Sequence, residues 1–202
     1  MGVYRLSFTT GGLYFRECLK VAPLYLELGC WDSVRNISIE ENLLQTNTRS
    51  SSVRTYREVS TRLQQFSNDE IELLVESSKQ DQRYLLWLAI CRQYKLIEEF
   101  AVEVIREKFL GMDLSLTHHD YNLFFNRKAD WHPELDELST STKNKLRQVL
   151  FRMLGEADLI SSGNQMIPAM LSPKVARAIF GTSNSQSVIY PISDADLGDL
   201  LL

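Results

Sequence analysis

The sequence predicts a mostly α-helical fold, in which a helical bundle is followed by a C-terminal winged-helix-like α+β unit. Apolar residues recur at three- and four-residue steps through most of the 202-residue chain, which is the period of amphipathic helices. Hydrophobic residues make up 44% and charged residues 24% of the chain, enough apolar material for a packed core. Near the C-terminus a helix, two short extended runs and a last helix follow one another. Winged-helix domains end in this order, although many small α+β units share it.

The first part of the chain predicts an extended lead-in and two helices. Residues 3–10 alternate weakly between apolar and polar and then meet Gly11-Gly12, which indicates a short extended segment that ends in a turn. Apolar spacing over residues 13–28 predicts a helix, and Pro23 predicts a kink or break in it because proline lacks the helical N–H donor. A second, shorter helix is expected within residues 31–44.

The middle of the chain predicts the centre of the bundle. The serines at 50–52 are capping candidates for an amphipathic helix that ends near residue 66, and a further helix is expected over residues 67–75. Residues 80–110 are apolar on so many sides that they should lie at the centre of the core. A break is expected near Tyr94-Lys95, because the apolar faces before and after it do not share one phase.

The last elements are marked by capping signals. Thr117 and Asp120 have the spacing of a capping box, which predicts the start of another helix. A capped helix is expected over residues 139–154, and two extended runs around a Ser-Gly-Asn turn over residues 159–167. Ser-Pro at the start of residues 172–180 predicts a final short helix.

The chain is predicted to divide into two units and a tail. The helical bundle spans residues 1–138 and the winged-helix-like unit spans residues 139–181, and the two units could also pack as one domain. Residues 182–202 contain three aspartates and no lysine or arginine. This acidic tail is expected to be mobile, or to dock through Val188-Ile189-Tyr190.

Composition restricts the possible functions. The net charge of −4 and the pI near 5.5 argue against a uniformly basic nucleic-acid binder, so any DNA contact must come from local patches. No stretch approaches ~18 consecutive apolar residues, so no membrane span is predicted. Cys18, Cys30 and Cys91 are widely spaced, which fits reduced core thiols in a cytoplasmic protein better than a disulfide frame or a zinc site.

No residue pattern argues for catalysis. The sequence has no P-loop, no Gly-x-Gly-x-x-Gly, no Gly-x-Ser-x-Gly and no His-Glu-x-x-His motif. His118 and His119 are adjacent and cannot ligate one metal from the same helix face, and His132 has no carboxylate-rich or cysteine-rich neighbourhood. The sequence therefore predicts a non-enzymatic protein without a cofactor or metal.

Two basic segments could contact DNA. Residues 49–63 contain four arginines and only one acid, Glu58. The serines at 50–52 could offer hydroxyl groups, and the backbone amides at the start of the helix, to a phosphate. The candidate contacts in this first segment are Arg49, Ser51, Arg54, Arg57 and Arg62. The predicted helix at 139–154 has four cations and no acid, which a winged-helix-like unit would present opposite its leucine face. The candidate contacts here are Lys143, Lys145, Arg147 and Arg152, joined by Lys174 and Arg177 on the last predicted helix.

These cations also have an ordinary interpretation, because any solvated helix face carries lysine and arginine. Charge and spacing by themselves favour backbone contact and carry no information on base recognition.

Four segments, which lie in one order and span most of the chain, resemble the BrxA family. They are SFTTGGLYFRE (7–17), ENLLQTNTRSSSVRTYREVSTRL (41–63), LLWLAICRQYKLIEEFAVEVIREKF (85–109) and NKLRQVLFRMLGEADLI (144–160). The middle two are the more specific. Thr9-Thr10 before Gly11-Gly12 is a departure from the family's glycine motif.

The resemblance implies a helical, NusB-like architecture and DNA binding without an activity of its own. It also implies action beside BREX partners, which include an ATPase, a methyltransferase and a phosphatase-like protein. Together these partners methylate host DNA and block phage replication. Two function classes therefore compete, a double-stranded-DNA-contacting component and a protein adaptor for BREX partners, and a cryptic enzyme ranks last.

Overall fold

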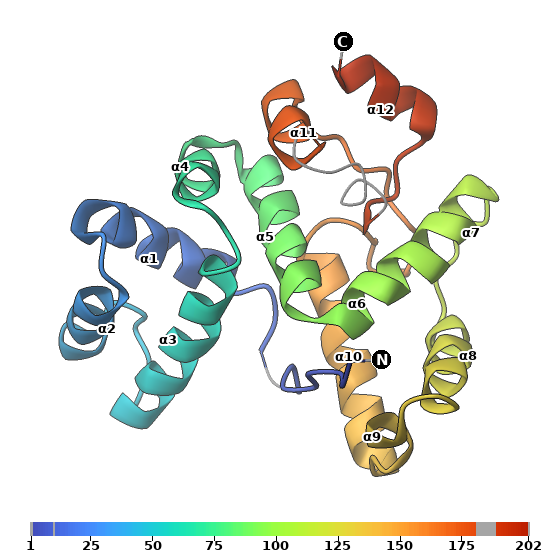
Figure 1. Cartoon of the computed structure of the whole chain (residues 1–202), viewed down its shortest axis with the longest axis horizontal. Coiled ribbons are helices and arrows are strands. Elements are labelled where there is room, and N and C mark those ends of the chain that lie inside the picture. Colours follow the sequence, from blue (N-terminus) through green and yellow to red (C-terminus); the bar gives the residue numbers. More distant parts are fainter. Residues whose placement is uncertain (1, 10, 181–188, 202) are drawn as a thin grey trace.

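The computed structural model describes residues 2–9, 11–180 and 189–201, which form twelve α-helices and one π-helix. This confirms the mostly helical prediction (Figure 1). The helices are α1 Phe15–Leu28, α2 Trp31–Glu40, α3 Arg49–Leu63, α4 Asn68–Glu76, α5 Lys79–Gln93, α6 Lys95–Phe100, η1 Ala101–Arg106, α7 Glu107–Leu110, α8 His118–Ala129, α9 Pro133–Asp136, α10 Thr140–Glu156, α11 Pro173–Phe180 and α12 Asp194–Leu201. No helix among the described residues is long and apolar enough to cross a membrane.

Helix α5 lies at the centre of the molecule. Figure 1 shows α1–α4 on one side of it and α6–α10 on the other. From Tyr84 to Cys91 every residue of α5 is buried, which is the expected position for a helix that is apolar on all sides. A single apolar cluster extends from the N-terminal segment to α12, so both predicted units contribute to one core.

The N-terminal segment crosses between the two sides. Tyr4 donates its backbone N–H to Glu134 at 2.9 Å, and Phe8 packs edge-on against Tyr94 with ring centroids 5.0 Å apart. The chain then turns through residues 11–13 to reach α1, which lies on the opposite side of α5 (Figure 1). Residues 11–13 are therefore a bridge between the two groups of helices.

Of the two predicted helix interruptions, one is present and one is not. The chain breaks at Tyr94, whose extended backbone (φ −127°, ψ 96°) separates α5 from α6 as predicted. Helix α1 passes through Pro23 as one continuous helix, so of the kink or break predicted there the break is wrong. No local pattern predicted the π-helix η1, which lies between α6 and α7.

The predicted strand pair at residues 159–167 is wrong. Only two isolated antiparallel bridges form among the described residues, Ile160 with Met166 and Ser115 with Gln165. The backbone of Met166 donates to Leu114 at 2.7 Å, in the loop before α8. The second run thus divides its hydrogen bonds between two partners instead of pairing along its length, and the winged-helix-like α+β unit is not supported.

The described part of the C-terminal tail packs on the core. Trp87 Nε1 donates to the carbonyl of Ile189 at 3.1 Å, and Tyr190 Oη donates to the carbonyl of Tyr84 at 2.9 Å. Arg106, at the end of η1, donates to the carbonyl of Ile192 and pairs with Asp194 at the start of α12. Residues 189–201 therefore follow the docking alternative, whereas Val188 and the rest of 182–188 lie outside the described residues.

The three cysteines occupy two kinds of environment. Burial raises the pKa of Cys18 to about 12 and raises the pKa of Cys91 well above its ordinary value. Cys30 is exposed at the N-cap of α2, where a hydrogen bond from the backbone of Ser33 lowers the pKa of its thiol. The expectation of core thiols is therefore wrong for Cys30.

Iodoacetamide is expected to alkylate Cys30 in the folded protein and to leave Cys18 and Cys91 unmodified. Only Cys30 is exposed, and its lowered pKa increases the thiolate fraction that reacts. Intact mass should show one adduct per chain at a pH of about 8, and peptide mapping should place it at Cys30. The denatured protein, with three adducts, is the control. An adduct on Cys91 in the folded chain would contradict the packing of α5.

Candidate nucleic-acid interface

The first predicted DNA segment begins at the N-cap of α3. The capping residue is Thr48, whose Oγ1 accepts the backbone N–H of Ser51 at 3.2 Å. The Thr48 hydroxyl also donates to Ser51 Oγ at 2.9 Å. The cap thus uses the backbone N–H of Ser51, and the Ser51 hydroxyl hydrogen is the donor that it leaves for a phosphate. The cap lies two residues before the predicted serines because Thr48 still has extended backbone.

Three of the four predicted arginines of α3 form an open cationic surface. Arg49, Arg54 and Arg57 are exposed, and none of their guanidinium groups has a hydrogen-bonding or ion-pair partner among the residues that the structure describes. We call these three residues the α3 arginine face. Arg54 and Arg57 point away from the buried side of the helix, which carries Tyr56 and Val59. Arg49 lies two turns before Tyr56 on the same side and is exposed because it stands in the first turn of the helix. The face therefore presents three guanidinium groups that are available to an anionic partner.

Arg62 is not part of this surface. Its side chain is 1% exposed, and Nη1 donates to the carbonyls of Gly12 at 3.0 Å and of Leu13 at 2.8 Å. The guanidinium also lies 5.3 Å from the centroid of the Tyr14 ring. A residue so enclosed cannot reach a phosphate without unfolding of its surroundings, so its assignment as a DNA contact is corrected to a structural one.

Residues 11–13 are held from two helices at once. Arg152 of α10 donates to the carbonyl of Gly11 at 3.0 Å, and the Glu156 carboxylate accepts the backbone N–H of Leu13 at 2.5 Å. A Cβ at position 12 would meet that carboxylate, so a larger residue there would have to displace the end of the Glu156 side chain from Leu13. Together with Arg62, these side chains form what we call the glycine clamp. Arg152 is thus also partly committed to structure.

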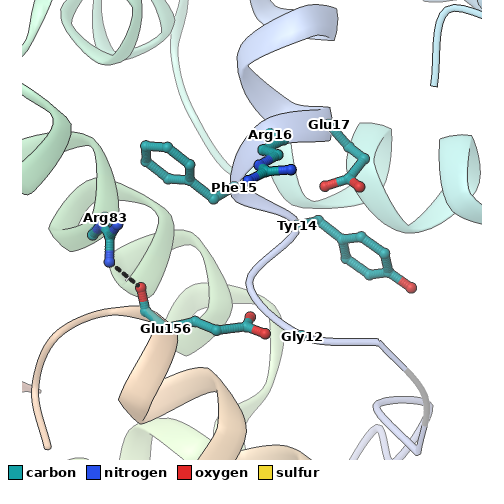
Figure 2. Close-up of a pocket in the computed structure, with 7 residues that line it drawn as sticks. All are labelled: Gly12, Tyr14, Phe15, Arg16, Glu17, Arg83 and Glu156. Atoms are coloured by element: carbon teal, nitrogen blue, oxygen red, sulfur yellow. Dashed lines mark hydrogen bonds between the residues drawn. The ribbon is translucent and has the colours of Figure 1, made fainter. Parts of the chain in front are cut away.

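A hollow of about 380 Å³ lies beside the clamp, where α1 begins. Figure 2 shows Arg83 directed at the carbonyl of Glu156, with the Glu156 carboxylate turned toward Gly12. Arg83 also pairs with Asp158 at 2.9 Å, and Arg16 and Glu17 add one charge of each sign. Because positive and negative groups balance here, the hollow does not favour an anion.

The cations of α10 do not share one face. Lys143 donates to the carbonyl of Asp136 at 3.1 Å and Arg147 donates to Asn122 Oδ1 at 2.8 Å, so both pack toward α8 and α9. Lys145 lies on the other side, exposed and without a partner among the described residues. Its neighbours there are polar, Asn144 among them. The prediction that all four cations face away from the leucines holds for Lys145 and Arg152 only.

The two cations of α11 lie elsewhere. Lys174 pairs with Glu76 of α4 at 2.8 Å, and Arg177 is exposed beside the same helix. Figure 1 shows the first turns of α3 and α10 at separate lower corners and α11 at the top. The structure therefore does not join the predicted contacts into one continuous surface, and the α3 arginine face is the largest group of free cations among them.

The described residues contain no group of three histidine, cysteine, aspartate or glutamate side chains that could hold a metal. His118 packs edge-on against Phe151 with ring centroids 4.8 Å apart, and His132 Nδ1 lies 3.1 Å from Glu134. Both histidines thus have structural contacts.

Comparison with known proteins decides the family. The model of the BrxA family matches residues 2–181. The chain belongs to the BrxA family. This confirms the resemblance, and the matched range covers both basic segments.

Two relatives of this BrxA-family chain carry the name BREX protein BrxA. The protein from Bacillus cereus (strain H3081.97) is 30% identical over 168 residues, which are 82% of this chain and 84% of the relative. The protein from Escherichia coli O9:H4 (strain HS) is 22% identical over 191 residues, which are 95% of this chain and 86% of the relative. Both alignments extend over most of the fold.

The fold also recurs in a crystal structure of an uncharacterized protein from Magnetospirillum magneticum. The two structures superpose with a TM-score of 0.77 over 94% of this chain and 98% of the other, at 20% identity. At this identity the likeness establishes a shared fold and no shared function.

Sequence reasoning missed the glycine clamp in this BrxA-family chain. The signal was the pair Gly11-Gly12, which by itself predicted only a turn. Glu156, whose carboxylate lies against Gly12, is more than 140 residues away, and no local pattern connects the two positions.

Proposed function

We propose that this BrxA-family chain is a non-enzymatic component of a BREX phage-defence system that contacts the backbone of double-stranded DNA. The α3 arginine face is the proposed contact, and Lys145 is a second, separate one. The proposal rests on one observation: Arg49, Arg54 and Arg57 are exposed, and their guanidinium groups have no partner among the described residues. A planar guanidinium suits phosphate because its fork of N–H groups binds two oxygens at once.

The proposed contact is local and independent of DNA sequence. The whole chain carries a net charge of −4, so its overall field opposes DNA and only the nearest phosphates are attracted. Phosphate contacts fix the position of a protein on the duplex without reading bases. Such a role is compatible with assistance to the BREX methyltransferase and to phage restriction, in which other proteins supply the chemistry.

Replacement of Arg49, Arg54 and Arg57 by alanine together is expected to weaken DNA binding on the order of 10- to 100-fold at low salt. Each lost phosphate contact should also reduce the salt dependence, by about 0.9 in the slope of log affinity against log salt. Fluorescence anisotropy with a short labelled duplex, repeated at about 50 and 200 mM salt, measures both quantities.

The matched control removes three cations that are exposed on other helices, Arg16, Lys79 and Arg127. This triple alanine variant has the same net charge as the first, so any difference in affinity reports the position of the arginines. Equal affinities of the two variants would overturn the assignment to α3. A Lys145→Ala variant, measured alone, tests the second contact.

The alternative function is a protein adaptor for BREX partners without direct DNA contact. Trp131 favours it, because this side chain is 74% exposed beside a partly apolar hollow of about 330 Å³ that also borders Val3. Exposed aromatic side chains are typical anchors of protein interfaces. An adaptor should form a complex with the BREX ATPase, methyltransferase or phosphatase-like protein that survives moderate salt in gel filtration. Loss of that complex in a Trp131→Ala variant would support this alternative.

A further inference from the structure

A groove lies on the C-terminal side of the molecule, between residues 168–171 and helix α12. It has a volume of about 520 Å³ and is lined mostly by apolar residues. Ala169, Leu171 and Ile192 are buried and form its floor. We call it the C-terminal groove. Its size lies within the range of roughly 300–1,000 Å³ that is usual for ligand sites.

Met170 projects from one wall of the groove into solvent. Its side chain is 81% exposed, and the neighbouring Ile167 is partly exposed as well. The backbone beneath it is nonetheless fixed, because Met170 N donates to Tyr84 Oη at 3.2 Å and Ala169 N donates to the Pro191 carbonyl at 2.9 Å. An apolar side chain held outward on a fixed backbone is a typical interface feature, and methionine adapts well to different partners.

The other wall of the groove, which α12 forms, is also fixed to the core. Arg106 is 7% exposed and joins the carbonyl of Ile192 to Asp194 at the start of α12. Leu197 of α12 is buried in the core. Tyr84 serves both walls, since its hydroxyl accepts from Met170 and its carbonyl accepts from Tyr190. A groove with two fixed walls loses little conformational entropy when a partner enters.

The rim of the groove is acidic. Asp196 and Asp199 line it, and their i, i+3 spacing places them along one side of α12. Asp196 accepts a hydrogen bond only from the neutral Ser193 hydroxyl, and Asp199 has no partner among the described residues. Among the described residues that line the groove there is no lysine or arginine, so none of them neutralises these two carboxylates.

We infer that the C-terminal groove docks a basic amphipathic segment of a partner protein. Apolar side chains of that segment contact Met170 and the floor, and its lysines or arginines pair with Asp196 and Asp199. Two like-charged carboxylates beside the floor repel DNA and anionic lipid, which leaves protein as the class of ligand. The α3 arginine face lacks a large exposed apolar side chain, so a second copy of this chain does not offer the required segment there.

The first test uses a labelled helical peptide of about 18 residues, with leucines on one face and lysines on the other. The folded full chain should bind it, as measured by fluorescence anisotropy, and should not bind a matched peptide with glutamate in place of lysine. The double variant Asp196→Lys, Asp199→Lys should weaken binding of the lysine peptide by about 10-fold or more. A Met170→Ser variant should weaken it several-fold, by roughly the value of one partly buried apolar side chain.

The control for charge is the double variant Glu72→Lys, Glu137→Lys, which changes two exposed acids on other surfaces by the same amount. It should bind the lysine peptide as the wild type does. Equal weakening by both double variants would overturn the proposal, because attraction would then follow net charge instead of the groove.

The second test places a photo-crosslinking benzophenone amino acid at position 170 of the full chain in its native host. Mass spectrometry of the adduct should identify a partner segment in which apolar residues alternate with lysine or arginine, and the yield should fall with Asp196→Lys, Asp199→Lys. The same amino acid at position 112, where Met112 is equally exposed and lines no proposed contact, is the control position. A crosslink to another copy of this chain, to a segment without basic residues, or to no protein would overturn the proposal.

Discussion

Replacement of Tyr190 by alanine is expected to lower the free energy of unfolding by about 3–5 kcal/mol. The side chain is completely buried, and its ring packs edge-on against Tyr84 with centroids 6.0 Å apart. Its hydroxyl remains a donor at all ordinary pH values, because burial raises the pKa of Tyr190 well above its usual value. Truncation therefore leaves a cavity and removes the anchor of residues 189–201.

Thermal unfolding followed by circular dichroism measures this effect. For a chain of this length each kcal/mol corresponds to roughly 2–4 °C in the melting temperature. Tyr190→Phe keeps the ring and should cost only about 1 kcal/mol, the value of one hydrogen bond. Trp131→Ala removes a larger but exposed ring and should change the melting temperature little. A Tyr190→Ala protein as stable as the wild type would mean that the tail is not docked in solution.

Replacement of Arg62 by alanine is expected to lower the free energy of unfolding by about 2–4 kcal/mol. The variant leaves the carbonyls of Gly12 and Leu13 without their buried donor and empties the space beside Tyr14. The glycine clamp would then hold residues 11–13 from α10 alone, through Arg152 and Glu156. Denaturant unfolding, with the midpoint and slope fitted together, measures the loss.

Arg57→Ala is the matched control, because it removes the same residue type from the same helix. Arg57 is exposed and should contribute less than about 0.5 kcal/mol to stability. The two variants should therefore separate: Arg62→Ala loses stability, and Arg57→Ala loses DNA affinity without loss of stability. If Arg62→Ala kept full stability and lost DNA affinity, the buried position of Arg62 would be incorrect.

Local signals in the sequence were sufficient to predict where most of the helices lie. The spacing of Thr117 and Asp120 predicted a capping box, and the structure confirms it at the start of α8. A second capping box, formed by Ser67 and Glu70, begins α4. The change of apolar phase at Tyr94 correctly marked the end of α5. Each of these features depends on residues within about one helical turn of each other, so a single sequence contains the necessary information.

The prediction of a strand pair at residues 159–167 was wrong because a strand needs a hydrogen-bonding partner along its length as well as a turn. The turn at residues 161–164 forms, with Asn164 N donating to the Ser161 carbonyl at 2.9 Å. The hydrogen bonds of the second run are then shared between Leu159 and Leu114, and the latter lies about fifty residues earlier in the chain. Competition between a local and a distant partner cannot be decided from alternation of apolar residues.

The sequence by itself determined the helical class, the helix break at Tyr94 and the two segments in which cations gather. Only the tertiary structure decided which of those cations are free. Arg57 and Arg62 belong to one helix and one basic run, yet the carbonyls of Gly12 and Leu13 enclose Arg62 and leave Arg57 in solvent. The physical reason is that the helical period sets the relative directions of the side chains on one helix. Burial of each side chain depends on which distant segment of the chain packs against that side of the helix.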